Sequence, residues 1–247
     1  MSCLKFSVVT LFPNMFDIFK QDGVIGTAIE KNLVSLESIN LRDFSDNKRK
    51  SVDDSPVGGA DGMILRADII YQAIQSLKNE NSYIVNLAPH GKVFHNQKAM
   101  EYAQKKHIIL LCGRYGGIDS RISENVADEN ISIGDFVLSG GELPAMCVID
   151  SVCRFIPQVL GNQQSNSMDS FQNGLLEPPQ YTKPNLFMNQ KIPEILFSGD
   201  HQKISKFQRK EQIKLTAKYR PDLLIIHWES LTKSEKELAK KFMREDL

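Results

Sequence analysis

The chain has 247 residues, of which 41% are hydrophobic and 24% are charged, and its formal net charge is zero. This composition is typical of a globular protein, and the length suffices for one large domain or two unequal ones. Even the longest unbroken apolar runs, such as residues 108–112, are far too short to span a membrane, and no signal peptide is expected. Four cysteines without a Cys-x-x-Cys pair indicate a reduced cytoplasmic compartment and no structural zinc site.

The charge is unevenly distributed along the chain. Residues 203–220 contain seven basic residues and one acid. Such a run could neutralise several phosphates, and it favours a nucleic-acid partner. A solvated helix face would produce the same pattern, so the run alone leaves both interpretations open.

A short apolar strand is predicted near the N-terminus, over residues 6–12, and it ends at Pro13. Two further strands are predicted over residues 84–88 and 107–112. Between them, residues 96–106 are rich in helix formers and contain no helix breaker. Strand, helix and strand at this spacing are typical of a parallel βαβ unit.

Another strand is predicted over residues 131–138, and it is followed by Ser139-Gly140-Gly141-Glu142. A long apolar helix over residues 143–160 comes next. Its Pro144 lies in the first turn, where the missing N–H costs nothing. Together these elements predict an α/β domain over residues 1–160.

The composition changes after this domain. Residues 161–174 are rich in asparagine, glutamine, serine and glycine, which predicts a flexible interdomain linker. Residues 175–247 are lysine-rich and have helical propensity. They predict a small helical domain that carries the basic run.

Glycine-bearing loops follow three of the predicted strands. They are Pro89-His90-Gly91, Gly113-Arg114-Tyr115-Gly116-Gly117 and Ile133-Gly134-Asp135. Ligands of parallel α/β sheets bind beyond the carboxyl ends of the strands, where glycines let the backbone approach closely. One such loop is usually a simple turn, but three in succession predict a shared small-molecule site. The glycine motifs of dinucleotide-binding enzymes and nucleoside triphosphatases are both absent, so those two classes have no support.

Several blocks of the sequence resemble the bacterial tRNA (guanine-N1)-methyltransferase family. The similarity runs in order through nearly the whole chain, and the longest block is too long to arise by chance. The blocks are Leu11-Phe12-Pro13-x-Met15-Phe16, Val52-Asp53-Asp54-x-Pro56-x-Gly58-Gly59, Leu110-Leu111-Cys112-Gly113-Arg114-Tyr115, residues 132–145, residues 149–157 and Asp169-Ser170-Phe171.

The resemblance implies a trefoil-knotted α/β fold with a mostly parallel sheet and flanking helices. It also implies S-adenosyl-L-methionine as methyl donor and a homodimer whose active sites are shared between the subunits. The implied cofactor contacts lie on the three glycine loops and around them, namely Leu87, Pro89, Gly91, Gly113, Tyr115, Ile133, Gly134, Asp135, Phe136, Val137, Leu138, Gly140, Gly141 and Pro144.

The implied reaction is methylation of N1 of the guanine immediately 3′ of the tRNA anticodon, at position 37. Asp169 matches the family's general base, and Arg154 matches the arginine that stabilises charge on guanine O6. Gly58 and Gly59 resemble the loop beside the target guanine. The basic run is expected to contact tRNA through Lys206, Arg209 and Lys210.

The sequence departs from the family's pattern after Gly59, where the loop continues Ala60-Asp61-Gly62-Met63 and the family usually has Gly-Pro-Gly-Met. Two other departures matter more. Gly116 and Met168 stand where the family commonly has acids that are linked to magnesium, so no protein metal ligand is predicted. Any magnesium is expected to be held by the RNA. A knotted methyltransferase that acts on another RNA position and a non-catalytic RNA-binding protein remain alternatives. Retention of both Asp169 and Arg154 argues against the second.

Overall fold

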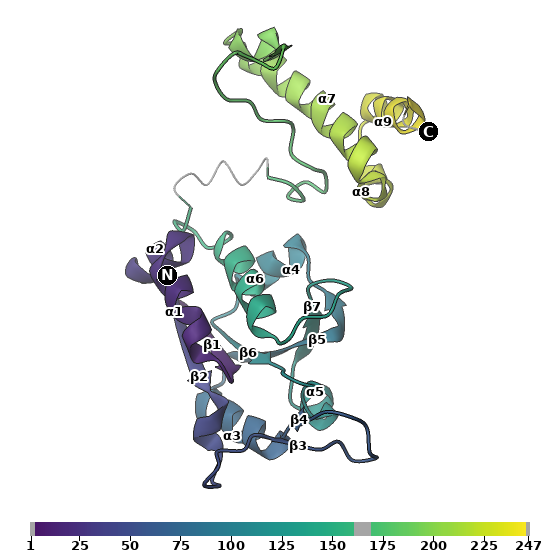
Figure 1. The fold of residues 1–247 in the computed structure, drawn as a ribbon. Coiled ribbons are helices and arrows are strands. Elements are labelled where there is room, and N and C mark those ends of the chain that lie inside the picture. Colours follow the sequence, from purple (N-terminus) through teal and green to yellow (C-terminus); the bar gives the residue numbers. More distant parts are fainter. Residues whose placement is uncertain (1–2, 161–168, 246–247) are drawn as a thin grey trace. The chain divides into compact units, whose positions relative to one another are not determined.

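The computed structural model describes residues 3–160 and 169–245. The predicted linker therefore falls largely outside the described residues, which resume at Asp169. The chain divides into two compact units, Met1–Gly161 and Asn162–Leu247. Figure 1 shows that the N-terminal unit combines a sheet with helices, whereas helices dominate the C-terminal unit.

The N-terminal unit contains a five-stranded sheet in the order β2-β1-β6-β5-β7. All neighbouring strands in this sheet run parallel. The carboxyl ends of the strands therefore point to one edge, as the three glycine loops require. The strands are β1 (Leu4–Thr10), β2 (Val34–Asn40), β5 (Ser82–Val93), β6 (His107–Cys112) and β7 (Glu129–Ser132).

Helices cover both faces of this sheet. One buried cluster joins the sheet to α2 (Gly23–Glu30), α4 (Asn96–Tyr102) and α6 (Glu142–Cys153). A second cluster joins the opposite face to α3 (Ala67–Leu77) and α5 (Ser120–Asn125). Figure 1 shows α6 and α3 on opposite sides of β1 and β6. The N-terminal unit is thus an α/β domain with a parallel central sheet.

The strands β1 and β6 are buried on both faces of the sheet. This explains why their sequences are nearly continuous apolar runs. In β6, Ile108 and Leu110 pack toward α6, whereas Ile109 and Leu111 pack toward α3. This alternation follows from the two-residue period of a strand. The strand predicted over residues 107–112 is confirmed with the same bounds.

Short elements complete the N-terminal unit. They connect β1 to α2 and β2 to α3. They are the 3₁₀ helices η1 (Pro13–Phe16) and η2 (Leu41–Phe44), the helix α1 (Asp17–Gln21), and an antiparallel pair formed by β3 (Asp53–Asp54) and β4 (Ile64–Leu65).

The strand predicted over residues 131–138 is wrong beyond Ser132, where β7 ends. Phe136, Val137 and Leu138 are exposed, so their apolar character does not reflect burial in a strand. Gly134 has a φ of 147°, a conformation that L side chains rarely adopt. The chain turns there and continues as a loop toward α6.

The helix predicted over residues 143–160 begins and ends earlier than expected. α6 spans Glu142–Cys153, and turns follow it to residue 159. Pro157 lacks an N–H and its ring clashes with the preceding helical turn, which prevents the helix from continuing through it. Arg154 therefore lies at the C-cap of α6.

The C-terminal unit contains three α-helices among its described residues: α7 (His201–Tyr219), α8 (Pro221–Ile226) and α9 (Lys233–Glu245). Leu175, Ile213, Leu224 and Phe242 belong to its buried cluster. Between Leu175 and α7 lie a small hairpin, β8 (Leu186–Phe187) with β9 (Gln190–Lys191), and the 3₁₀ helix η4 (Glu194–Phe197). A further 3₁₀ helix, η5 (Trp228–Ser230), follows α8. No helix within the described ranges combines the length and apolarity that a membrane crossing needs.

Candidate active site

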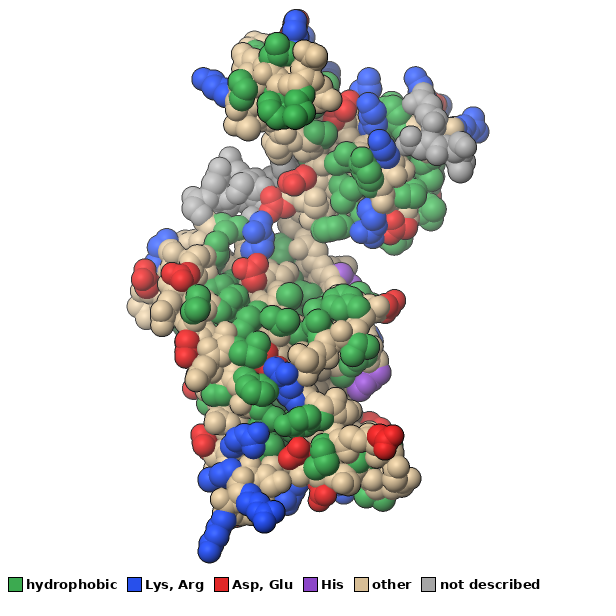
Figure 2. Space-filling view, viewed as in Figure 1, with side chains coloured by type: hydrophobic (Ala, Val, Ile, Leu, Met, Phe, Trp, Pro, Cys, Tyr) green, Lys and Arg blue, Asp and Glu red, His purple; other side chains and the backbone are tan. Residues whose placement is uncertain are grey.

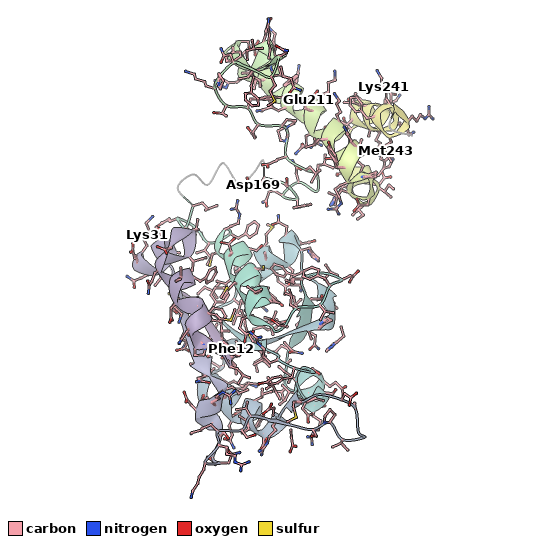
Figure 3. All side chains as sticks on the ribbon, viewed as in Figure 1. Phe12, Lys31, Asp169, Glu211, Lys241 and Met243 are labelled. Carbon is pink, nitrogen blue, oxygen red and sulfur yellow. The ribbon has the colours of Figure 1, made fainter. Side chains whose placement is uncertain are left out.

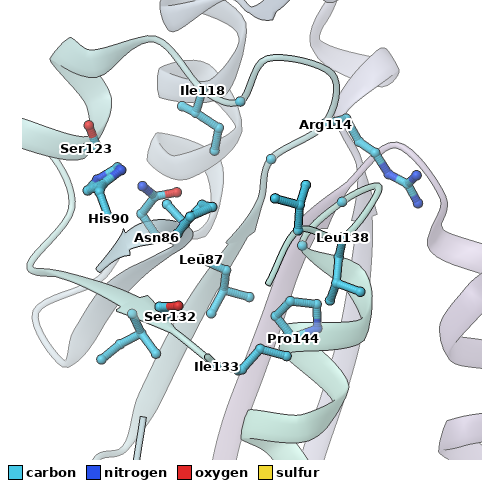
Figure 4. Close-up of a pocket in the computed structure, with 18 of the residues that line it drawn as sticks. Asn86, Leu87, His90, Arg114, Ile118, Ser123, Ser132, Ile133, Leu138 and Pro144 are labelled. Carbon is cyan, nitrogen blue, oxygen red and sulfur yellow. The ribbon is translucent and has the colours of Figure 1, made fainter. Parts of the chain in front are cut away.

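A cavity of about 340 Å³ lies at the carboxyl ends of β5, β6 and β7. Its walls come from an irregular stretch inside β5, from the loops after β6 and β7, and from the start of α6. The prediction that a strand ends at residue 88 and is followed by a loop is wrong, because β5 continues to Val93 and Pro89-His90-Gly91 lies where its pairing with β7 shifts register, between Leu87 and Lys92. Figure 4 shows the side chains of Leu87, Ile133, Leu138 and Pro144 around it. This volume lies within the usual range for small-molecule sites. The three segments from which a shared site was predicted therefore border one cavity, and the ligand stays a prediction.

Most of the residues expected to bind the cofactor line this one cavity. They are Leu87, Pro89, Gly113, Tyr115, Ile133, Gly134, Phe136, Val137, Leu138, Gly140, Gly141 and Pro144. Gly91 and Asp135 are not among the lining residues. Gly91 instead lies where the pairing of β5 with β7 shifts register, and a Cβ there would collide with the backbone of Ile131. Asp135 is exposed on the loop after β7.

Two residues of the cavity loops, Tyr115 and Gly141, have backbone positions that few residues adopt. Tyr115 has a φ of 58°, which is uncommon for a residue with a side chain. Gly141 lies so close to the end of β6 that an added Cβ would be 2.6 Å from the Cα of Cys112. The N–H of Gly141 donates to the carbonyl of Gly113 at 2.9 Å. Gly141 thus allows the loop before α6 to lie directly against the loop after β6.

We predict that Gly141→Ala weakens binding of S-adenosyl-L-methionine more than tenfold, or about 1.4 kcal/mol, because the added methyl group pushes the two loops apart. Gly199→Ala is the control, since Gly199 belongs to the C-terminal unit and its added Cβ would meet nothing within 4 Å. Isothermal calorimetry on both folded variants measures the difference. Equal affinities would show that the contact between these loops does not shape the site.

A buried ion pair holds the same two loops together. The Arg114 Nε lies 2.9 Å from the Glu142 Oε2, and the Glu142 side chain is almost fully buried. Thr10, at the end of β1, donates its hydroxyl to Glu142 Oε1 at 2.7 Å. Arg114 also donates to the Ser139 carbonyl at 3.2 Å and stacks on the ring of Phe12, with 4.3 Å from its Cζ to the ring centroid. This network was not predicted.

The network gives Gly140 a second role. A Cβ at Gly140 would collide with the Arg114 side chain, which passes over this glycine to reach Glu142. The glycine pair that suggested a ligand loop therefore also gives room to an ion pair. The sequence feature that could have indicated this ion pair is the acidic residue directly after the glycines, in Gly140-Gly141-Glu142.

Burial and charge also affect Cys112, the last residue of β6. Its thiol is buried, and this burial, together with the nearby Glu142 carboxylate, raises its pKa well above the usual value. Arg114 opposes this shift but does not outweigh it. The thiol therefore stays protonated and inert at neutral pH.

The expected guanine loop lies between β3 and β4. Gly58 and Gly59 have φ values of 102° and 81°, so glycine is required at both for the loop to turn as it does. The far end of this loop is tied to the cavity, because the N–H of Gly116 donates to the Met63 carbonyl at 2.8 Å. The structure thus connects the expected guanine loop to one of the cavity loops.

The two expected catalytic residues lie in different compact units. Arg154 is an exposed residue of the N-terminal unit, at the end of α6. Asp169 belongs to the C-terminal unit, where it is half-buried (Figure 3). The carbonyl of Asp169 accepts from the N–H of Gln172 at 3.2 Å, so Asp169 begins a turn.

The three expected RNA-binding residues lie on α7 but differ in their contacts. Lys206 and Lys210 are exposed. Arg209 instead donates to Glu235 of α9 at 2.6 Å and to Gln212 at 2.7 Å. Although burial opposes it, the contact with Arg209 holds the pKa of Glu235 below its usual value. Arg209 therefore joins two helices of the C-terminal unit.

Comparison with known proteins supports one family. Residues 4–225 match the family described as tRNA (Guanine-1)-methyltransferase TrmD. A tRNA (guanine-N(1)-)-methyltransferase of Dictyoglomus turgidum is 44% identical over 242 residues, covering 98% of both chains. The protein of the same name from Anoxybacillus flavithermus is 42% identical over 98% of this chain and 100% of its own length. That of Buchnera aphidicola is 48% identical over 89% of this chain and 84% of its own. The chain belongs to the tRNA (guanine-1)-methyltransferase family.

Proposed function

We propose that this protein transfers the methyl group of S-adenosyl-L-methionine to N1 of the guanine immediately 3′ of the anticodon, position 37, in tRNA. Family membership over nearly the whole chain supports the reaction. The structural observation that carries the proposal is the cavity built by β5 and by the loops after β6 and β7. Because tRNA is cytoplasmic, the protein is proposed to act there.

The residues of the cavity fit this cofactor. Leu87, Ile133 and Leu138 offer aliphatic surface to a flat purine ring, and Gly113 and Gly141 expose backbone to a ligand. When bound, the sulfonium group of the cofactor supplies an electrophilic methyl group. The role of the cavity loops is to hold that methyl group in line with the nucleophile.

The protein's own residues make guanine N1 nucleophilic. N1 carries a proton at neutral pH, and we assign its removal to the Asp169 carboxylate as general base. Loss of this proton moves negative charge onto O6, where the Arg154 guanidinium stabilises it. The support for both roles is the match of these residues to the family's motif, since each also has a simple structural explanation as a turn or cap residue.

The course of the chain supports a trefoil knot in the N-terminal unit. β7 lies at the edge of the sheet beside β5, yet the following helix, α6, packs against the central strands β1 and β6. The connecting residues therefore pass across the carboxyl ends of β5 and β6. Along this path Gly141 bonds to Gly113 and the Arg114 side chain crosses Gly140. We propose that this passage closes the knot.

We also propose a homodimer in which each active site receives residues from both subunits. Exposed hydrophobic side chains of the N-terminal unit support it, including those of Ile18, Val137 and Leu143. Figure 2 shows hydrophobic side chains gathered over one face of this unit. Val137 belongs to the cavity wall, so a partner that covers it would also complete the site.

The C-terminal unit is proposed to bind tRNA through α7. We predict that Lys206→Glu with Lys210→Glu weakens tRNA binding and lowers the slope of log Kd against log salt by about one for each phosphate that is no longer neutralised. Filter binding across a salt series measures the slope. The matched control is Lys31→Glu with Lys78→Glu, which reverses two exposed lysines of the N-terminal unit and should leave the slope unchanged. An unchanged slope in the double lysine variant of α7 would make the run a solvated helix face.

Magnesium is proposed to act through the RNA. Position 116, beside the cavity, is a glycine and offers no carboxylate to a cation. Magnesium keeps most of its water and usually needs one or two protein carboxylates when it binds a protein directly. Phosphates of the bound tRNA can supply the oxygen ligands instead.

The function is tested by incubating the protein with labelled S-adenosyl-L-methionine and unmodified tRNA and then mapping the methylated nucleoside. Label in 1-methylguanosine at position 37 is the expected result. Label at another nucleotide would assign the chain to another RNA position. Tight tRNA binding without label would instead indicate a non-catalytic RNA-binding protein.

A further inference from the structure

One polar atom in the wall of the cavity has no partner. Asn86 lies within β5, just before its irregular stretch, is only 2% exposed and lines the cavity. Its Oδ1 is buried and accepts no hydrogen bond from any described residue. Figure 4 shows its side chain between those of Leu87 and His90.

A chain of hydrogen bonds fixes which end of the Asn86 amide is unpaired. The carbonyl of Ser123 can only accept, so it must receive its bond from Asn130 Nδ2, at 3.0 Å. Asn130 Oδ1 is then an acceptor, and it receives Asn86 Nδ2 at 2.8 Å. The Asn86 amide cannot rotate by half a turn without placing two oxygens or two amino groups against each other. The unpaired atom is therefore the oxygen.

A buried acceptor without a donor is costly, roughly 1–3 kcal/mol, so such atoms are normally satisfied. The space in front of Asn86 is the cavity itself, which makes a bound ligand the available source of a donor. No aspartate or glutamate lines this cavity among the described residues, and most of the other lining side chains are aliphatic. Asn86 is consequently placed to recognise a hydrogen-bond donor on the ligand.

We propose that Asn86 Oδ1 accepts a hydrogen bond from a ribose hydroxyl of the cofactor and selects for that hydroxyl. This inference rests on the proposed function. The cofactor also carries an adenine amino group and a methionine ammonium. The aliphatic wall formed by Leu138 and Pro144 lies across the cavity from Asn86 (Figure 4) and suits the adenine. An ammonium would have to be desolvated against one neutral oxygen, which costs more than placing a neutral hydroxyl there.

The test compares S-adenosylhomocysteine with its 2′-deoxy and 3′-deoxy analogues by isothermal calorimetry. The wild-type protein should bind one of the deoxy analogues about 3- to 10-fold more weakly than the parent, the effect of one neutral hydrogen bond. Asn86→Leu, which keeps the side-chain size, should bind the parent more weakly and lose the discrimination. Asn125→Leu, an exposed asparagine of α5, is the matched control and should behave as wild type.

A second pair of variants tests the orienting chain without touching the ligand. Asn130→Leu removes the acceptor that holds the Asn86 amide and should reduce the discrimination. Asn130→Asp retains that acceptor but turns its second oxygen toward the Ser123 carbonyl, so it should restore the discrimination only in part. A purely structural role of Asn130 would change the thermal stability of both variants without changing the ratio of the affinities.

The outcomes separate this inference from the proposed function. Wild-type protein that does not bind S-adenosylhomocysteine would overturn both. Binding by the wild type with full hydroxyl discrimination in Asn86→Leu would overturn this inference alone. The third outcome concerns 5′-methylthioadenosine, which lacks the amino-acid ammonium of S-adenosylhomocysteine. If Asn86→Leu keeps the hydroxyl discrimination and loses only the preference for S-adenosylhomocysteine over this compound, Asn86 binds the ammonium and the hydroxyl assignment is overturned.

Discussion

Replacing Asp169 by Asn should reduce turnover by roughly 10²–10⁴-fold, the usual contribution of a positioned general base. Asparagine keeps the size and much of the hydrogen bonding of aspartate, but it cannot take the guanine N1 proton. The Kd for S-adenosyl-L-methionine should stay unchanged, because Asp169 does not line the cavity of the N-terminal unit. Single-turnover methylation of tRNA, together with calorimetry of the cofactor, measures the two effects separately.

The exposed Asp46 offers a matched control, because Asp46→Asn removes the same charge from another part of the chain. It should retain full turnover. Activity above a tenth of wild type in Asp169→Asn would show that another group removes the proton. A loss of tRNA affinity equal to the loss of turnover would instead give Asp169 a role in binding.

The central strands and the sheet edge that carries the cavity could be predicted because each depends on a local pattern. A strand buried on both faces, such as β6, is a short continuous apolar run, and its parallel neighbours require glycine loops at one edge. The apolar residues 136–138 were misread as part of a strand for the same reason. A local pattern cannot distinguish a side chain buried in a sheet from one that lines a cavity or covers a subunit interface.

The polar parts of the site depend on contacts between distant segments, which no local pattern reveals. Glu142 is buried only because Arg114 and Thr10, from two other segments of the chain, meet it. Asn86 likewise depends on Asn130, which lies 44 positions away along the chain. Its unpaired oxygen becomes visible only when the partners of every nearby amide are known. Asp169 and Arg154 were assigned by resemblance, because their local environments also suit a turn and a helix cap.

Among single charge-removing substitutions in the N-terminal unit, those in the ion pair between Arg114 and Glu142 should lower the free energy of unfolding most. Arg114→Gln or Glu142→Gln leaves one charge buried without its partner, a change that costs about 3–5 kcal/mol in buried pairs. The double variant should cost clearly less than the sum of the two, because neither charge is left unpaired. Arg66→Gln, which breaks an exposed pair with Asp68, should change little.

Urea unfolding followed by far-UV circular dichroism measures these effects, and the protein supplies its own internal reference. The only tryptophan of the chain, Trp228, lies in the C-terminal unit. Its fluorescence should report an unchanged transition in all three variants, whereas the dichroism transition of the N-terminal unit moves to lower urea. Affinity for S-adenosyl-L-methionine should fall in parallel, because Arg114 and Glu142 hold together the two loops that form the cavity wall. Additive losses in the double variant would show that the two charges stabilise the unit independently, and that the loops are held by the bond between Gly141 and Gly113 instead.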